Sequence, residues 1–124
     1  MKSDNIIQQK SFSFAIRIVN VYKYLISEKK EFVLSKQLLR SGTSIGANIE
    51  ESIGGQSNKD FLSKISISYK EARETIYWLK LFHVTEYLSE TEAESLLKEA
   101  NEICKILGKN PINSQKPQFV IFNS

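Results

Sequence analysis

The sequence predicts an all-α fold, an antiparallel up-down-up-down four-helix bundle. Apolar residues recur at spacings of three and four along four segments, which is the period of one helix face. Proline occurs twice and glycine five times in 124 residues, so helix interiors are seldom interrupted. The links between the segments are short, which makes consecutive helices antiparallel neighbours. We expect one domain, 1–109, with helices at about residues 9–29, 32–53, 58–84 and 90–108, followed by a C-terminal tail, 110–124.

The first helix has apolar residues on more than one face. One face has apolar residues at spacings of three and four, and these are Phe12, Ala15, Val19, Tyr22 and Ile26. Further apolar residues widen this surface, and they are Ile16, Ile18, Val21 and Leu25. This surplus exceeds one stripe of a bundle helix.

The second helix has two glycines in its interior, Gly42 and Gly46, and ends at Gly54 and Gly55. Each interior glycine costs a helix about 1 kcal/mol relative to alanine, so some other interaction must offset it. Because Gly42 and Gly46 are one turn apart, they leave a smooth groove where a neighbouring helix can approach closely. The alternative is a break near Gly42 that gives two shorter helices.

The third and fourth helices have clear start signals. Ser57 is an N-cap candidate with Asp60 three residues on, and Ser89 with Glu92 matches a capping box. A heptad in the third helix, taken as its core face, consists of Leu62, Ile65, Tyr69, Ala72, Ile76 and Leu79. The apolar stripe of the fourth helix consists of Ala93, Leu96, Ala100, Ile103 and Leu107.

Composition excludes several functional classes. Cys104 and His83 are the only cysteine and histidine, which excludes an internal disulfide framework and a zinc site built on these residue types. His83 continues the core heptad of the third helix, so we do not expect it to be a general base. The sequence shows no signal peptide and no membrane span. We therefore expect a cytoplasmic protein that is not an enzyme and has no cofactor or metal.

Two motifs carry a family resemblance. The run from Leu34 to Glu51, LSKQLLRSGTSIGANIEE, resembles the signature of the bacterial rRNA intervening-sequence protein family, also called the four-helix-bundle protein family. The run KEARET at 70–75, followed by YWL at 77–79, is the second match. The resemblance implies a continuous second helix, a homopentamer of bundles and a bacterial, cytoplasmic origin, but no biochemical activity. A relative with the same fold is the accessory protein of diversity-generating retroelements, which binds nucleic acid and a reverse transcriptase.

Charge is unevenly distributed along the chain. The net charge is +3, yet residues 86–109 are acidic on balance while 1–31 and 58–85 are basic. A basic surface concentrates phosphate-bearing partners, so RNA or DNA is a candidate partner. The candidate nucleic-acid residues are Lys70, Arg73, Tyr77 and Lys80 on one face of the third helix, and Lys10 and Arg17 on the first. The alternative is that segments of opposite sign face one another or only keep the surface hydrated.

Surplus apolar residues on the third helix predict self-association. They lie outside the heptad and are Phe61, Ile67, Tyr77, Trp78, Leu81 and Phe82. Apolar area that one bundle cannot bury usually marks an interface, where Trp and Tyr are common hot spots. Candidates for ion pairs at or near this interface are Arg40, Arg73, Glu50 and Glu74. The alternative to self-association is that this wide apolar stripe packs against two neighbouring helices of its own bundle. The alternative for the charged residues is that they form ion pairs without a function.

These observations favour a homo-oligomeric scaffold or adaptor, most simply a pentameric ring, that presents repeated basic patches to RNA or DNA. The alternative is a pure protein–protein adaptor, for instance to a reverse-transcriptase-like partner. The apolar run from Phe119 to Phe122 in the tail predicts packing against the bundle, an adjacent subunit or another chain.

Overall fold

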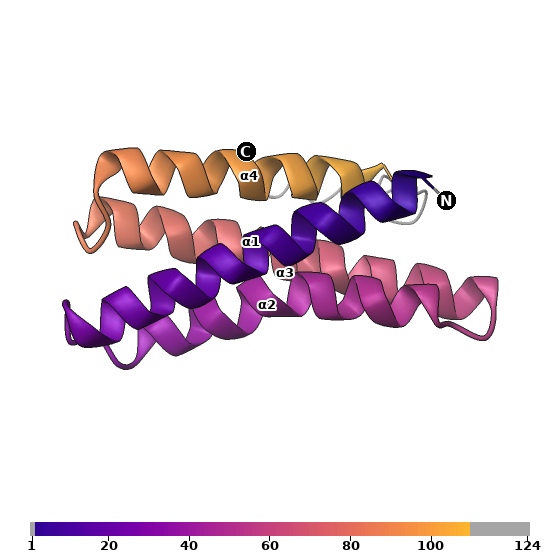
Figure 1. Cartoon of the computed structure of the whole chain (residues 1–124), viewed down its shortest axis with the longest axis horizontal. Helices are drawn as coiled ribbons and strands as arrows, with labels where there is room; N and C mark the ends of the chain where they lie inside the picture. The colour runs from indigo at the N-terminus through magenta and orange to yellow at the C-terminus, as the bar shows by residue number, and fades with distance from the viewer. Residues whose placement is uncertain (1, 110–124) are drawn as a thin grey trace, which may run out of the picture.

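The computed structural model describes residues 2–109, with side chains from residue 6 onward, and the predicted tail lies outside this range. The helices are α1 (Lys2–Ser27), α2 (Leu34–Ile53), α3 (Asn58–Val84) and α4 (Glu90–Gly108). They lie lengthwise against one another, and the chain reverses direction at each connection (Figure 1). Contacts join α1 to α2, α2 to α3, α3 to α4 and α1 to α4. The described residues contain no strand, and the predicted all-α four-helix bundle is confirmed.

Serine caps start α3 and α4, as the sequence indicated. The Ser57 hydroxyl oxygen accepts a hydrogen bond from the Asp60 N–H at 3.1 Å. The Ser89 hydroxyl oxygen accepts one from the Glu92 N–H at 3.2 Å. Each cap satisfies a backbone donor that has no partner inside its helix. The first helix, in contrast, begins at Lys2 rather than near residue 9.

The start of α2 depends on the side chain of Glu31. Its carboxylate accepts hydrogen bonds from the N–H groups of Leu34 at 3.0 Å and Ser35 at 2.6 Å. Partial burial acts to raise the pKa of this carboxyl, but the hydrogen bonds from the backbone outweigh it and lower the pKa. This cap places the first turn at Leu34, two residues later than the apolar pattern suggested.

The buried face of α1 is not the one that the spacing of Phe12 to Ile26 marks. The buried residues are Ile7, Ser11, Phe14, Ile18, Val21 and Leu25. Phe12 is 69% exposed and Ile16 is 50% exposed. Helix α1 therefore has two apolar stripes, of which one packs into the bundle and the other remains partly in solvent.

The core stripe predicted for α4 is confirmed, whereas the heptad predicted for α3 is shifted. All five predicted residues of α4 are buried. The buried residues of α3 are Ile65, Ser68, Ala72, Thr75, Leu79 and Phe82. Tyr69 and Ile76, which the heptad placed in the core, lie at its edge. The reason is that the hydroxyls of Ser68 and Thr75 find hydrogen-bond partners on α2, so these polar residues can be buried without penalty.

Helix α2 is continuous through its glycines, and the alternative of a break near Gly42 does not occur. A Cβ atom at Gly42 would lie 2.8 Å from Cγ1 and Cγ2 of Ile18 on α1. A Cβ atom at Gly46 would lie 3.2 Å from the hydroxyl oxygen of Ser11. The absence of side chains at these positions lets α1 and α2 approach closely, which offsets the low helix propensity of glycine.

Helix α1 crosses the bundle obliquely (Figure 1). A hollow of about 450 Å³ lies between α1 and the start of α4, and Arg17, Tyr24 and Leu88 are among the residues that line it. No helix among residues 2–109 combines the length and apolar character needed to cross a membrane.

Candidate nucleic-acid interface

A groove runs along the outer side of the α3–α4 pair. It consists of two adjoining hollows of about 330 and 550 Å³, which share Asn101 and Cys104. The lining residues are Tyr69, Arg73, Ile76, Tyr77 and Lys80 of α3, and Asn101, Cys104, Lys105, Gly108 and Lys109, at and just after α4. We call this surface the α3–α4 groove.

Tyr69 and Arg73 form a fixed unit inside the α3–α4 groove. The guanidinium of Arg73 lies 5.9 Å from the centre of the Tyr69 ring and donates a hydrogen bond to the Tyr69 hydroxyl at 3.3 Å. The Tyr69 ring rests against α4 at Gly108, where a Cβ atom would lie 3.2 Å from Cε1 of the ring. Glycine at 108 therefore lets the ring approach the α4 backbone closely.

The α3–α4 groove is positively charged and has no carboxylate among its lining residues. Within residues 2–109, no ion pair involves Arg73, Lys80 or Lys105. Burial raises the pKa of the Cys104 thiol, against a smaller opposing effect of Arg73, so the thiol stays uncharged at neutral pH. The cations of the groove are thus free to meet phosphate groups.

The structure separates the predicted nucleic-acid residues into two groups. Arg73, Tyr77 and Lys80 line the α3–α4 groove, and Lys70 is exposed on the outer side of α3. Lys10 and Arg17 instead face α4. Arg17 pairs with Glu99 and, at 3.3 Å, with Glu92, while Lys10 lies 3.6 Å from Glu102.

The ion pairs at the α1–α4 seam neutralise Lys10 and Arg17 of α1. Acidic side chains of residues 86–109 therefore face α1, as expected where segments of opposite charge face one another. We leave Lys10 and Arg17 out of the candidate interface for this reason.

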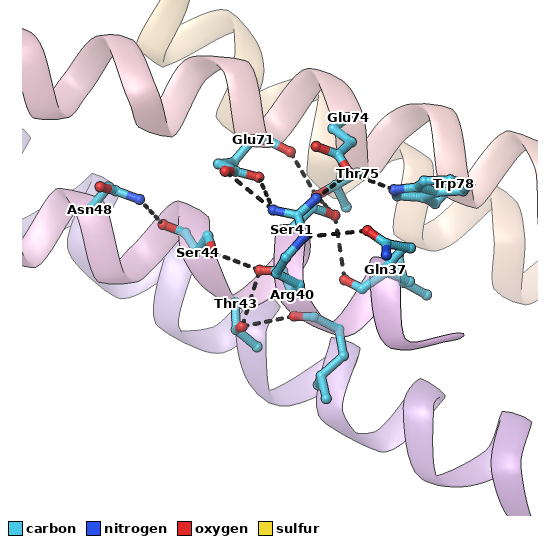
Figure 2. A network of polar contacts seen from close by, with 12 residues as sticks. Gln37, Arg40, Ser41, Thr43, Ser44, Asn48, Glu71, Glu74, Thr75 and Trp78 are labelled. Atoms are coloured by element: carbon cyan, nitrogen blue, oxygen red, sulfur yellow. Dashed lines mark hydrogen bonds and ion pairs between the residues drawn. The ribbon is translucent and has the colours of Figure 1, made fainter. Parts of the chain in front are cut away.

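A second polar cluster joins α2 to α3, and Arg40 is at its centre (Figure 2). The guanidinium donates to both carboxylate oxygens of Glu71, at 3.1 and 3.4 Å, and to Glu74. The indole N–H of Trp78 donates to Glu74 at 2.9 Å. Burial acts to raise the pKa of Glu74, but the hydrogen bonds from Arg40 and Trp78 outweigh it and lower the pKa. Arg40 therefore forms an ion pair within one chain.

Beneath this cluster, small hydroxyl residues fill the α2–α3 contact. The Thr75 hydroxyl donates to the Ser41 hydroxyl at 2.9 Å (Figure 2). The Ser68 hydroxyl donates to the Ile45 carbonyl at 2.8 Å. The hydroxyl of Ser44 and the amide of Asn48 bond to carbonyls of α2 itself. Buried polar groups in this contact are thereby satisfied.

The residues of α3 that were predicted to form an interface fall into buried, exposed and half-buried groups. Phe82 is a correction, since it is 1% exposed and packs edge-on against Tyr87 in the core of its own bundle. Tyr77 is 58% exposed and Ile67 is 37% exposed. The half-buried members are Phe61, Trp78 and Leu81.

Exposed apolar residues also lie on the outer side of α1 and α2. They include Phe12 and Ile16 on α1 and Ile53 on α2. Val19 and Ile26 on α1 and Leu39 on α2 are half-buried. At the rim, the side-chain amide of Gln8 donates to the Glu50 carboxylate at 2.9 Å. We call this surface the α1–α2 face. The surplus of apolar residues on the first helix was the signal that pointed to it.

The α1–α2 face and the α3–α4 groove lie on opposite sides of the bundle, because contacts connect the helices in the order α1, α2, α3, α4 and back to α1. Among the described residues, no group of three or more His, Cys, Asp or Glu side chains is arranged to hold a metal ion. The class that these features define is a small all-α bundle with one basic groove and one apolar face.

Comparisons with known proteins give the family. A family model for the 23S rRNA-intervening sequence protein matches residues 3–109, so the chain belongs to this family. The chain is also similar to a crystal structure, at 1.70 Å resolution, of a protein of unknown function from the S23 ribosomal protein family of Bacteroides thetaiotaomicron. The two are 54% identical with a TM-score of 0.83, and the match covers 85% of this chain and 94% of the other. The comparison with curated proteins gives no match.

Proposed function

We propose that the protein is a non-enzymatic, homo-oligomeric scaffold that binds nucleic acid through its α3–α4 groove. The observation that carries this proposal is the set of cations in the groove, Arg73, Lys80 and Lys105, which have no carboxylate partner among the described residues. Cations whose charge is not neutralised by a carboxylate are available for phosphates, and releasing the counterions of a nucleic acid favours such binding. A cytoplasmic site of action belongs to the proposal, since one cysteine in the chain suits a reducing compartment.

The α1–α2 face supplies the self-association that the proposal requires. Phe12 and Ile16 expose large apolar side chains one helical turn apart, and such a surface is stabilised when a second copy covers it. Because this face is opposite the groove, an assembly built on it leaves every groove open. A ring of such bundles, with five copies as the favoured number, repeats the groove and increases avidity without further contacts.

A gel-shift titration with RNA and duplex DNA at increasing salt tests the binding. We expect the wild-type protein to bind at micromolar concentration in low salt and to weaken steeply as salt rises. The double variant Lys80→Glu/Lys105→Glu is expected to lose about tenfold or more in affinity and to show a shallower salt dependence.

The matched control is Lys29→Glu/Lys36→Glu, which changes the net charge equally at exposed positions in the α1–α2 connection and on α2. We expect this control to lose much less affinity than the groove variant. Absence of any shift with micromolar wild-type protein would refute the proposal, and equal losses in both double variants would refute the location.

A protein–protein adaptor without nucleic-acid affinity is the second candidate, and the α1–α2 face favours it as a docking surface. Light scattering separates the two. If the protein remains a 14 kDa monomer at high concentration and shifts no nucleic acid, the face serves another protein.

A further inference from the structure

We propose that the α3–α4 groove takes single-stranded rather than double-stranded nucleic acid, with one base stacked on Tyr77. This inference rests on the proposed function and specifies its ligand. Three features of the molecule support it, namely the position of Tyr77, the neighbours of its ring and the cations on either side.

Tyr77 is an exposed aromatic residue between cations. Its side chain is 58% exposed although it lines the groove. Arg73 precedes it by four residues and Lys80 follows it by three, about 6 and 4.5 Å along the helix axis at 1.5 Å per residue. All three line the same hollow. Aromatic rings alternating with cations in a groove are typical of single-strand binding, in which bases stack and phosphates follow the charges.

The contact between Tyr77 and Trp78 leaves a ring face available. The two rings are T-shaped, with centres 5.0 Å apart and planes at 72°. A T-shaped contact covers at most one face of either ring. The Trp78 indole is held by its hydrogen bond to Glu74, so Tyr77 has a fixed neighbour on the side of α2. The opposite side of Tyr77 opens to the groove and to solvent.

A duplex cannot use this arrangement fully. Its bases are stacked inside the helix, so it can offer phosphates to Arg73 and Lys80 but no base face to Tyr77. An unpaired strand offers both. The difference in affinity between the two ligands therefore arises at Tyr77, whereas the cations contribute to both.

The experiment measures binding of oligomers of about 15 nucleotides, long enough to cover one groove completely, as uridine RNA, as thymidine DNA and as each annealed to its complement. Trp78 is the only tryptophan and lies next to Tyr77, so its fluorescence reports binding at this position. We expect both single strands to bind more tightly than either duplex. Tyr77→Ala is expected to weaken single-strand binding by at least about fivefold and to leave duplex binding within about twofold of wild type.

Two variants control for folding and for general loss of aromatic surface. Tyr77→Phe keeps the ring and is expected to bind single strands within about twofold of wild type. Tyr24→Ala removes a tyrosine that is 41% exposed on α1, away from the groove, and is expected to have no effect. Circular dichroism establishes that all variants keep their helices.

The outcomes separate this inference from the proposed function. Equal affinity for single strands and duplexes, with Tyr77→Ala unchanged, would overturn the inference and leave nucleic-acid binding intact. No binding of any oligomer would overturn both. Tighter binding of one single strand, RNA or DNA, with the same loss in Tyr77→Ala would support the inference and identify the sugar that the groove prefers.

Discussion

Gly42 shows how a single missing methyl group sets the distance between two helices. Alanine at this position gains about 1 kcal/mol of helix propensity, but its Cβ atom would lie 2.8 Å from two carbons of Ile18. Overpacking of this kind costs about 1–3 kcal/mol, so we expect Gly42→Ala to lower the free energy of unfolding by about 1 kcal/mol. Urea denaturation measures this. Gly46→Ala is the matched comparison, and we expect a smaller loss, because its Cβ atom would lie 3.2 Å from the Ser11 hydroxyl oxygen and 3.5 Å from the Cβ and carbonyl oxygen of Ser11. A more stable Gly42→Ala protein would contradict the close approach.

Glu31 gives a pH dependence whose sign follows from its cap. The pKa of its carboxyl is lowered in the folded protein from its ordinary value of 4.5, so the folded state favours the charged form. This contribution to stability is present above pH 4.5 and is lost as the pH falls through the folded pKa. We expect Glu31→Gln to destabilise the protein by about 1 kcal/mol at about pH 7 and by less at about pH 3. Thermal unfolding at both values measures the difference, and an equal loss at the two values would show that the charge is irrelevant to the cap.

At the scale of helices, the Arg40 cluster couples α2 to α3 through one side chain. Arg40→Ala removes the contacts to Glu71 and Glu74 and leaves two carboxylates one turn apart. Since all three groups are partly exposed, we expect a loss of about 1 kcal/mol in the free energy of unfolding. Arg40→Lys retains the charge but not the forked geometry, and we expect most of the loss to remain. If Arg40→Lys has the same free energy of unfolding as the wild type in urea denaturation, a charge contact without the forked geometry is sufficient to stabilise the α2–α3 pair.

The four helices and the serine caps of α3 and α4 were predictable, because the apolar period, a serine three residues before an acidic residue and a glycine at a helix end are local signals. The start of α1 and the Glu31 cap of α2 were not predicted. The inward faces of α1 and α3 were less predictable. Helix α1 has two apolar stripes with the same period, and contacts with other helices, such as the packing of Ile18 against Gly42, decide which one is buried. Helix α3 buries Ser68 and Thr75, which a hydropathy pattern counts as polar, because their partners are on another helix.

The candidate site was predictable on one helix only. The helical period alone places Arg73, Tyr77 and Lys80 on one face of α3. Their α4 neighbours, Asn101 and Lys105, depend on which side of α4 packs against α3, and no local pattern specifies that. The same reason explains why the charge pattern groups Lys10 and Arg17 with the candidates, since their partners on α4 are distant in sequence.

At the scale of the whole molecule, the two surfaces lie on opposite sides, so we expect that a variant can change one surface without changing the other. Phe12→Asp/Ile16→Asp puts charges on the α1–α2 face, so we expect smaller particles in light scattering at concentrations where the wild type is oligomeric. Val84→Asp is the control, because Val84 is 72% exposed at the end of α3, outside both surfaces. An oligomer unchanged by the Phe12 and Ile16 changes would place the contact elsewhere.

The most direct test of the central claim is photo-cross-linking of a thiouridine-substituted single-stranded RNA to the wild-type protein, followed by mass spectrometry of the cross-linked peptides. Binding in the α3–α4 groove predicts cross-links on the peptides that contain Tyr69 to Lys80 and Asn101 to Lys109. Cross-links confined to peptides of α1 and α2 would contradict it.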